Sequence, residues 1–284
     1  MKTDGRESTN VEDRRGSGMR RPGLVGGGLG AIVIVIAALI FGVDPQMMLG
    51  LLGEAPAPSR PAPSRSAAPP EDPQARFVAV VLADTEDTWR PLFRSAGRQY
   101  EDPRLVLFSG ATPTACGAGQ AAAGPFYCPL DRSVYIDLAF YDELQRRFQA
   151  PGDFAQAYVI AHEVGHHVQH QLGIMEEAQA LEKKLPPEQA RQVSVRLELQ
   201  ADCFAGVWAH HAQQARQVVE PGDIEEALRA AAAVGDDTLQ KAAQGRVVPE
   251  SFTHGSAEQR ARWFRTGWQS GRIADCNTFA RGAV

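Results

Sequence analysis

The hydrophobic pattern divides the chain into an apolar segment near the start, a proline-rich stretch and a long region of short apolar runs and helical periods. Three β-rich runs, at residues 77–82, 104–108 and 133–138, predict strands. From residue 139 onward, apolar positions recur mainly with helical spacing. A few strands followed by many helices predict an α+β fold in which helices dominate. The predicted helices cover residues 85–97, 139–149, 152–171, 174–184, 188–216, 223–234 and 256–270.

The apolar segment, residues 23–43, carries no charge over 21 residues. As a helix it would be about 31 Å long, which is close to the hydrocarbon thickness of a bilayer. We therefore expect residues 1–22 to form a polar cytoplasmic tail and residues 23–43 to form a single-pass anchor, because arginines precede the segment. The alternative is a cleaved signal peptide, but the run is long for one, so we favour an uncleaved anchor in the cell membrane. The arginines are Arg14, Arg15, Arg20 and Arg21.

The remaining chain would then lie outside the cytoplasm, in a periplasm or the open medium. Residues 44–75 are rich in proline, alanine and serine in their second half, which is typical of an extended stalk. Residues 76–284 are enough for one folded domain with its own core. The net charge of −5 and the lack of a basic tract in this region argue against a nucleic-acid partner.

The strongest chemical signal is His162-Glu163-Val164-Gly165-His166, an H-E-x-x-H sequence within a predicted helix. At 100° per residue, His162 and His166 lie about 40° apart, so both imidazoles can bind one metal ion. Glu163 can then reach a water molecule on that metal without binding the metal itself. This pattern is typical of a zinc hydrolase with two histidine ligands and a general base.

A catalytic zinc usually has a third protein ligand, and we expect this to be Glu198. Asp202 follows one turn later on the same predicted helix face and would accept a hydrogen bond from a ligating histidine. Gly165 offers room for the two helices to approach closely. His167 and His170 are alternative ligands, although His167 points about 100° away from the shared face. An ordinary solvated acidic pair is the alternative interpretation of the Glu-x-x-x-Asp spacing.

His254 precedes the last predicted helix and has two interpretations. It could donate a hydrogen bond to the oxyanion of a tetrahedral intermediate, which would make it a catalytic residue. It could equally be a capping or structural histidine.

The four cysteines allow three pairings, and their number suits two disulfides outside the cytosol. We expect Cys116 to pair with Cys128, and Cys203 with Cys276. The second bridge would connect the helix of Glu198 to the C-terminal segment. Metal binding by these cysteines is disfavoured because no C-x-x-C spacing occurs.

Several phrases together resemble the putative neutral zinc metallopeptidase family of bacterial membrane-anchored proteins. They are GPFYCP at 124–129, VYIDL at 134–138, GDFAQAYVIAHEVGHHVQ at 152–169, LELQADCFAGVWA at 197–209 and FTHGSAEQR at 252–260. The family is more remotely similar to gluzincin peptidases. The resemblance implies a zincin-like metallopeptidase domain with zinc bound by His162, His166 and Glu198 and with Glu163 as the catalytic residue. It also draws attention to His254.

The expected function is therefore that of a membrane-anchored endopeptidase that uses Zn²⁺ to hydrolyse a peptide or protein substrate outside the cytoplasm. Glu163 would accept a proton from water and pass it to the leaving amine. By analogy with related architectures, the strand at 133–138 would be the exposed edge that pairs with the substrate. The alternatives are a zinc-stabilised envelope binding module without turnover, and a zinc amidase that acts on cell-wall peptides.

Overall fold

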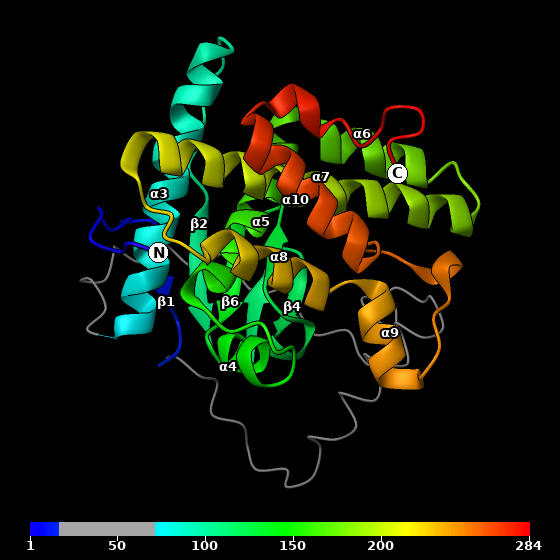
Figure 1. Cartoon of the computed structure of the whole chain (residues 1–284), viewed down its shortest axis with the longest axis horizontal. Helices are drawn as coiled ribbons and strands as arrows, with labels where there is room; N and C mark the ends of the chain where they lie inside the picture. The colour runs from blue at the N-terminus through cyan, green and yellow to red at the C-terminus, as the bar shows by residue number, and fades with distance from the viewer. Residues whose placement is uncertain (17–71) are drawn as a thin grey trace, which may run out of the picture.

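The computed structural model describes residues 1–16 and 72–284 (Figure 1). In this part of the chain, a four-stranded sheet has the order β1-β2-β6-β5, in which β1, β2 and β6 are parallel and β5 is antiparallel to β6. A separate antiparallel hairpin is formed by β3 and β4. The strands are β1 (Val11–Asp13), β2 (Arg104–Phe108), β3 (Ala111–Thr114), β4 (Gly117–Gln120), β5 (Phe126–Cys128) and β6 (Ser133–Asp137).

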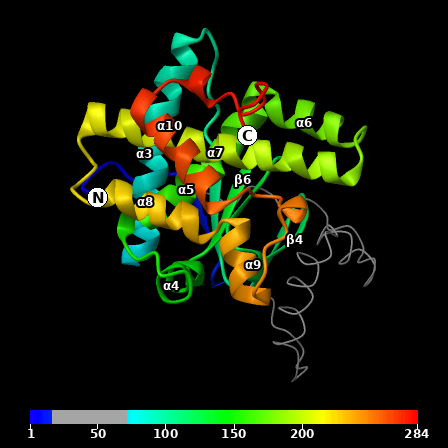
Figure 2. The ribbon, with the colours of Figure 1, turned by 45° about the vertical axis from the view of Figure 1, so that its right-hand side comes forward.

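Helices form most of the rest of the described chain, and α5 lies at their centre (Figures 1 and 2). It packs against α3, α6, α7, α8 and strands β5 and β6, and it is buried along most of its length. The helices are α3 (Pro73–Ser95), α4 (Ala139–Arg146), α5 (Asp153–Leu172), α6 (Ile174–Glu182), α7 (Pro187–Arg216), α8 (Asp223–Ala233), α9 (Asp236–Gln244) and α10 (Ala257–Ser270), with 3₁₀ turns at Ala121–Ala123, Pro249–Ser251 and Ile273–Cys276.

The predicted helix-dominated α+β class is confirmed, and the helices predicted from residue 139 onward correspond to α4 to α8 and α10. The short helix α9 was not predicted. Helix α5 ends at Gly173, which has a left-handed backbone with φ of 81°. A residue without a Cβ adopts this conformation without strain, so the chain can turn there directly into α6.

The prediction of a strand at residues 77–82 is wrong, because these residues belong to α3. Asp72 caps this helix by accepting a hydrogen bond from the Gln74 amide at 2.9 Å, and Pro73 occupies its first turn. The run from Val78 to Leu82 is buried at every position. A continuous apolar run does not distinguish a buried helix from a buried strand, and here tertiary packing decides. The helix predicted at 85–97 is the second half of α3.

Strands predicted at 104–108 and 133–138 are confirmed as β2 and β6. The expectation that residues 133–138 form an exposed edge is wrong, because β6 is paired on one side with β2 and on the other with β5. In the described sheet the edge strand on that side is β5, which is only three residues long and was not predicted.

Both expected disulfides are present. Cys116–Cys128 joins the turn of the β3–β4 hairpin to β5, and Cys203–Cys276 joins α7 to the C-terminal 3₁₀ turn. The second bridge connects the C-terminal segment to the helix of Glu198, as predicted.

Among the described residues, no helix is both long and apolar enough to cross a membrane. The predicted anchor at 23–43 and most of the predicted stalk lie outside the described residues. Within the predicted tail, residues 1–16 are described, and Val11–Asp13 form strand β1 of the main sheet. The cytoplasmic placement of residues 1–22 stays a prediction. The helical part of the domain also begins at Pro73 instead of residue 76.

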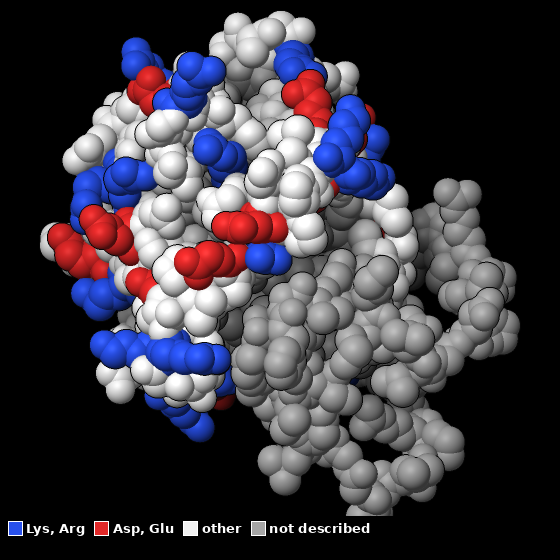
Figure 3. All heavy atoms as spheres, turned by 90° about the vertical axis from the view of Figure 1, so that its right-hand side faces the viewer, with Lys and Arg blue, Asp and Glu red and all other residues white. Residues whose placement is uncertain are grey.

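The surface carries both signs of charge. Figure 3 shows basic and acidic side chains interspersed on one face of the described part of the molecule. On this face the charges are not segregated into one continuous basic or acidic field.

Candidate metal centre

Helices α5 and α7 bring together the three predicted ligands. The Nε2 atom of His162 lies 3.2 Å from Glu198 Oε2, and the Nε2 atom of His166 lies 3.4 Å from Glu198 Oε1. One ligand atom from each residue lies within 4.8 Å of the other two. The two imidazole rings are perpendicular, with centroids 4.8 Å apart. Glu198 follows His166 by 32 positions in the sequence, yet side chains from both helices converge on one point.

This group fits a zinc ion. Zinc binds histidine nitrogen and carboxylate oxygen at about 2.0–2.2 Å in a tetrahedron, which places neighbouring ligand atoms about 3.3 Å apart. Each imidazole nitrogen lies at about this spacing from one Glu198 oxygen, that of His162 at 3.2 Å from Oε2 and that of His166 at 3.4 Å from Oε1. Two imidazoles and one carboxylate are also a typical ligand set for catalytic zinc.

Both histidines are oriented by hydrogen bonds on the ring nitrogen that faces away from Glu198. The Nδ1 atom of His162 lies 2.8 Å from Asp202 Oδ1, and that of His166 lies 2.9 Å from Gln169 Oε1. Because these oxygens accept hydrogen bonds, each ring carries its proton on Nδ1 and presents the Nε2 lone pair to the metal position. Asp202 therefore lies where its predicted role requires, whereas Gln169 was not predicted.

Asp202 is fully buried and has a second charged partner, Arg260. The Nε and Nη2 atoms of Arg260 lie 2.9 and 3.0 Å from the Oδ2 and Oδ1 atoms of Asp202, and the Tyr158 hydroxyl donates a further hydrogen bond to Oδ1. Burial alone would raise the pKa of Asp202, but Arg260 and His162 outweigh it and the pKa is lowered. The carboxylate is therefore kept ionised as the acceptor for His162. Arg260 was missed as a site residue because arginine is mostly exposed, so its sequence context suggests a surface position.

Glu163 is buried on α5 between the two histidines, with 7 % of its surface exposed. Burial raises the pKa of its carboxyl, and the charge of Glu198 acts in the same direction, while His162 and His166 partly oppose it. A raised pKa suits a general base, because it makes the carboxylate a stronger acceptor for the proton of the attacking water.

His254 is fixed by an aspartate that was not predicted. The Nδ1 atom of His254 lies 3.2 Å from Asp236 Oδ1 at the start of α9. The other oxygen of Asp236 accepts the backbone amides of Thr253, His254 and Gly255 at 2.7–3.0 Å. The His254 side chain remains 41 % exposed. The structure thus presents an oriented, accessible imidazole. Burial would lower the pKa of His254, but the hydrogen bond to Asp236 and the charge of Glu198 outweigh it and raise the pKa.

The alternative ligands His167 and His170 face β5 instead of the metal position. Both Nδ1 atoms contact the hydroxyl of Tyr127, at 2.9 and 2.8 Å. The Nε2 atom of His167 contacts the Glu101 carbonyl at 2.7 Å, and that of His170 contacts Glu176 at 3.1 Å. Burial lowers the pKa of His167 to about 4, so this ring stays neutral. These contacts anchor the edge strand to α5.

Gly165 permits the close approach of α5 and α7, as the sequence suggested. A Cβ atom there would lie 2.9 Å from the Ala201 carbonyl oxygen and 3.1 Å from its Cα. We expect Gly165→Ala to lower the free energy of unfolding by about 1–3 kcal/mol, because backbone atoms must move apart. It should also weaken zinc binding by moving Glu198 away from the histidines.

Thermal unfolding and zinc titration check this prediction, with the partly exposed α5 variant Gln156→Ala as the control. Wild-type stability and zinc affinity in Gly165→Ala would show that the helices are not in tight contact.

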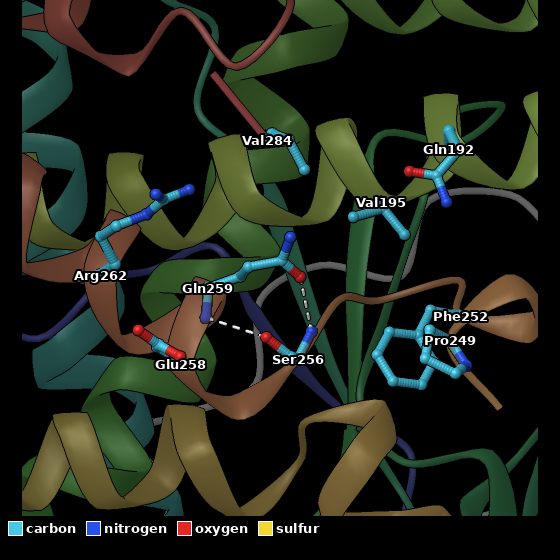
Figure 4. Close-up of a pocket in the computed structure, with 9 residues that line it drawn as sticks. All are labelled: Gln192, Val195, Pro249, Phe252, Ser256, Glu258, Gln259, Arg262 and Val284. Atoms are coloured by element: carbon cyan, nitrogen blue, oxygen red, sulfur yellow. Dashed lines mark hydrogen bonds between the residues drawn. The ribbon is translucent and has the colours of Figure 1, made fainter. Parts of the chain in front are cut away.

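A pocket of about 470 Å³ lies beside the centre, between α7, α10 and residues 249–256 (Figure 4). Val195, one turn before Glu198, and Phe252, two residues before His254, form part of its apolar surface. Ser256 and Gln259 line it while forming the capping box of α10. The side chains of His162, His166 and Glu198 do not line this pocket.

Fold and site together define a protein of the H-E-x-x-H zinc-binding class. The chain belongs to the family described as putative neutral zinc metallopeptidase, which it matches over residues 1–279. Zn²⁺ is the cofactor that this family implies.

Relatives match over most of their length. The chain is 52 % identical to the protein YpfJ of Escherichia coli K12, over 97 % of each chain. It is 41 % identical to the protein Rv2575 of Mycobacterium tuberculosis H37Rv and to Mb2605 of Mycobacterium bovis, over 86 % of this chain and 85 % of theirs. No solved structure matches the chain.

Proposed function

We propose that this protein is a zinc-dependent endopeptidase whose metal is held by His162, His166 and Glu198. The observation that carries the proposal is the convergence of the two Nε2 atoms and the Glu198 carboxylate within 4.8 Å. Zinc bound there would polarise the scissile carbonyl and lower the pKa of a water molecule. The family description supports a peptidase in particular.

The base in this proposal is Glu163. It accepts the proton of the attacking water and then delivers it to the leaving amine. Its place on α5 directly after His162 puts it beside the metal position, and burial raises the pKa of its carboxyl. Glu163 does not belong to the group formed by His162, His166 and Glu198, so its carboxylate is available for proton transfer.

His254 would donate a hydrogen bond to the oxyanion that develops on the substrate carbonyl. Asp236 holds the Nδ1 side of the ring at 3.2 Å and so directs Nε2 outward. The exposure of this side chain supports contact with a substrate, whereas a purely structural histidine would be expected to be enclosed.

The substrate backbone would lie along β5, which takes the role first expected of residues 133–138. Strand β5 ends the described sheet beside α5, and Tyr127 joins it to His167 and His170 on that helix. An extended peptide can add to a sheet edge through backbone hydrogen bonds and thereby be aligned with the metal site.

A non-catalytic binding module would need a structural zinc site, which normally has four protein ligands. The group formed by His162, His166 and Glu198 has three, which favours a position open to water and substrate. An amidase with specificity for cell-wall peptides would use the same chemistry, so substrate preference separates it from an endopeptidase.

The test is to incubate the zinc-loaded full chain with unfolded protein substrates, a peptide library and cell-wall peptides. We expect cleavage within peptide chains that stops when a chelator removes zinc and returns when zinc is restored. Cleavage of cell-wall peptides alone would favour the amidase, and the absence of any turnover by the zinc-loaded protein would favour the binding module.

We expect His254→Ala to lower kcat by about 10²–10³-fold while zinc content stays at the wild-type level, because one donor to the oxyanion is lost. Asp236→Asn should have a smaller effect, since the amide still accepts backbone hydrogen bonds but holds the imidazole less firmly. Steady-state kinetics with metal analysis check both. Unchanged kcat in His254→Ala would assign this histidine a structural role only.

A further inference from the structure

The N-terminal segment, residues 1–16, is built into the domain in the structure. Strand β1 extends the sheet by pairing with β2, with Val11 opposite Leu105 and Asp13 opposite Leu107. Backbone hydrogen bonds of 2.9 and 2.8 Å, from Leu105 to Asn10 and from Arg14 to Leu107, continue this pairing beyond the strand. The segment is therefore held by main-chain contacts as well as by side chains.

The clearest dependence of the domain on this segment is at Glu86, a fully buried carboxylate on α3. Ser8 and Asn10 donate to its Oε1 atom at 2.5 and 2.8 Å, and Arg6 donates to Oε2 at 2.7 Å. The other partner, Arg90, is 3.4 Å away. A buried carboxylate without partners is strongly unfavourable, so the sequence of α3 requires the N-terminal segment to be in place.

The segment also brings two distant parts of the chain together. The guanidinium of Arg15 contacts the carboxylate of Asp72, 57 positions later, at the N-cap of α3. Arg15 pairs in addition with Asp13, and Arg14 pairs with Glu12. Two of the four arginines that predicted a cytoplasmic tail, Arg14 and Arg15, are therefore engaged in contacts within the domain.

These contacts constrain any membrane topology. One crossing between residues 16 and 72 would separate their ends by about 30 Å of hydrocarbon, which no hydrogen bond between Arg15 and Asp72 can span. The uncharged run at 23–43 has the length of one helical crossing and not of two. The docked segment and the predicted single-pass topology are thus mutually exclusive.

We propose that residues 1–16 are an integral part of the folded domain and lie on the same side of any membrane as the metal site. The proposal does not depend on peptidase activity, so the two can fail separately.

Docking is tested by thermal unfolding of the full chain. Ser8→Ala with Asn10→Ala should lower Tm by roughly 5–10 °C, because two hydrogen bonds to a buried charge are lost. The same pair in a Glu86→Met background should shift Tm much less, since no buried charge remains there. The exposed neighbour Thr9, changed to alanine, is the control. If the double substitution left Tm unchanged in the Glu86 background, the segment would not be docked.

The common compartment is tested with a maleimide that does not cross membranes, in intact cells that express the full chain. Single cysteines replace the exposed residues Asp4 in the segment and Val247 in the domain, and the four native cysteines are in disulfides. We expect both positions to react, or neither, before permeabilisation, and both to react afterwards. Reaction at only one position in intact cells would overturn the proposal.

Discussion

We expect Glu163→Gln to retain zinc but to lose peptide hydrolysis by about 10²–10⁴-fold, which is the contribution expected of a general base. The substitution keeps the size of the side chain and removes only its ability to accept and return a proton. The metal ligands His162, His166 and Glu198 remain, so the amount of bound zinc should equal that of the wild type.

The measurements are zinc content by mass spectrometry and kcat/KM on the best substrate of the library. Glu177→Gln, an exposed change on α6, is the matched control and should leave both values unchanged. Glu163→Asp keeps a carboxylate but shortens the side chain by one methylene group. It therefore tests whether the position of the base matters as well as its chemistry. Wild-type turnover in Glu163→Gln would remove Glu163 from the mechanism.

We expect Glu198→Ala to reduce zinc affinity by more than 10²-fold and to abolish activity at limiting zinc. Substitutions of residues that only orient a ligand typically weaken metal binding by 10–100-fold, and loss of a ligand must cost more. The pKa of Glu198 is held well below its ordinary value: burial would raise it, but His166 and His162 outweigh burial. Its charge also offsets that of the ion, and alanine removes both the charge and the donor atom.

Competition with a chelating dye measures this affinity. Asp202→Asn is the comparison with a residue that only orients a ligand, and it should weaken zinc binding by about 10–100-fold. An amide oxygen can still accept a hydrogen bond from His162, but the amide no longer forms an ion pair with Arg260. Wild-type affinity in Glu198→Ala would place the third ligand elsewhere. His170 is a poor substitute, since its ring nitrogens already contact Tyr127 and Glu176.

The centre joins elements that are far apart in the sequence through one buried network. Asp202 contacts both the proposed ligand His162 on α5 and Arg260 on α10, and the Cys203–Cys276 bridge ties the C-terminal 3₁₀ turn to α7. Gln169, which orients His166, also donates to the Leu197 carbonyl at 2.7 Å. The position of α7 relative to α5 is thus maintained by hydrogen bonds as well as by apolar packing, which keeps Glu198 in place before zinc binds.

Parts of this site could be derived from the sequence because they depend on local geometry. The spacing of His162 and His166 places them on one helix face whatever the fold, and Glu198 with Asp202 follows the same rule on α7. Gln169 lies three residues after His166, a neighbouring position on the helix surface, and this spacing could have identified it. The β-rich composition of residues 104–108 and 133–138 likewise predicted β2 and β6.

The sequence by itself determined the helix-dominated class, the H-E-x-x-H motif and its two carboxylate partners, since each rests on periodicities within a single element. Only the tertiary structure decided that residues 77–82 are helical, that β6 is internal, that Arg260 and Asp236 orient the site, and that residues 1–16 complete the sheet. Those features arise from contacts between segments tens of residues apart. Such contacts leave no local pattern, because burial and pairing depend on which elements the fold brings together.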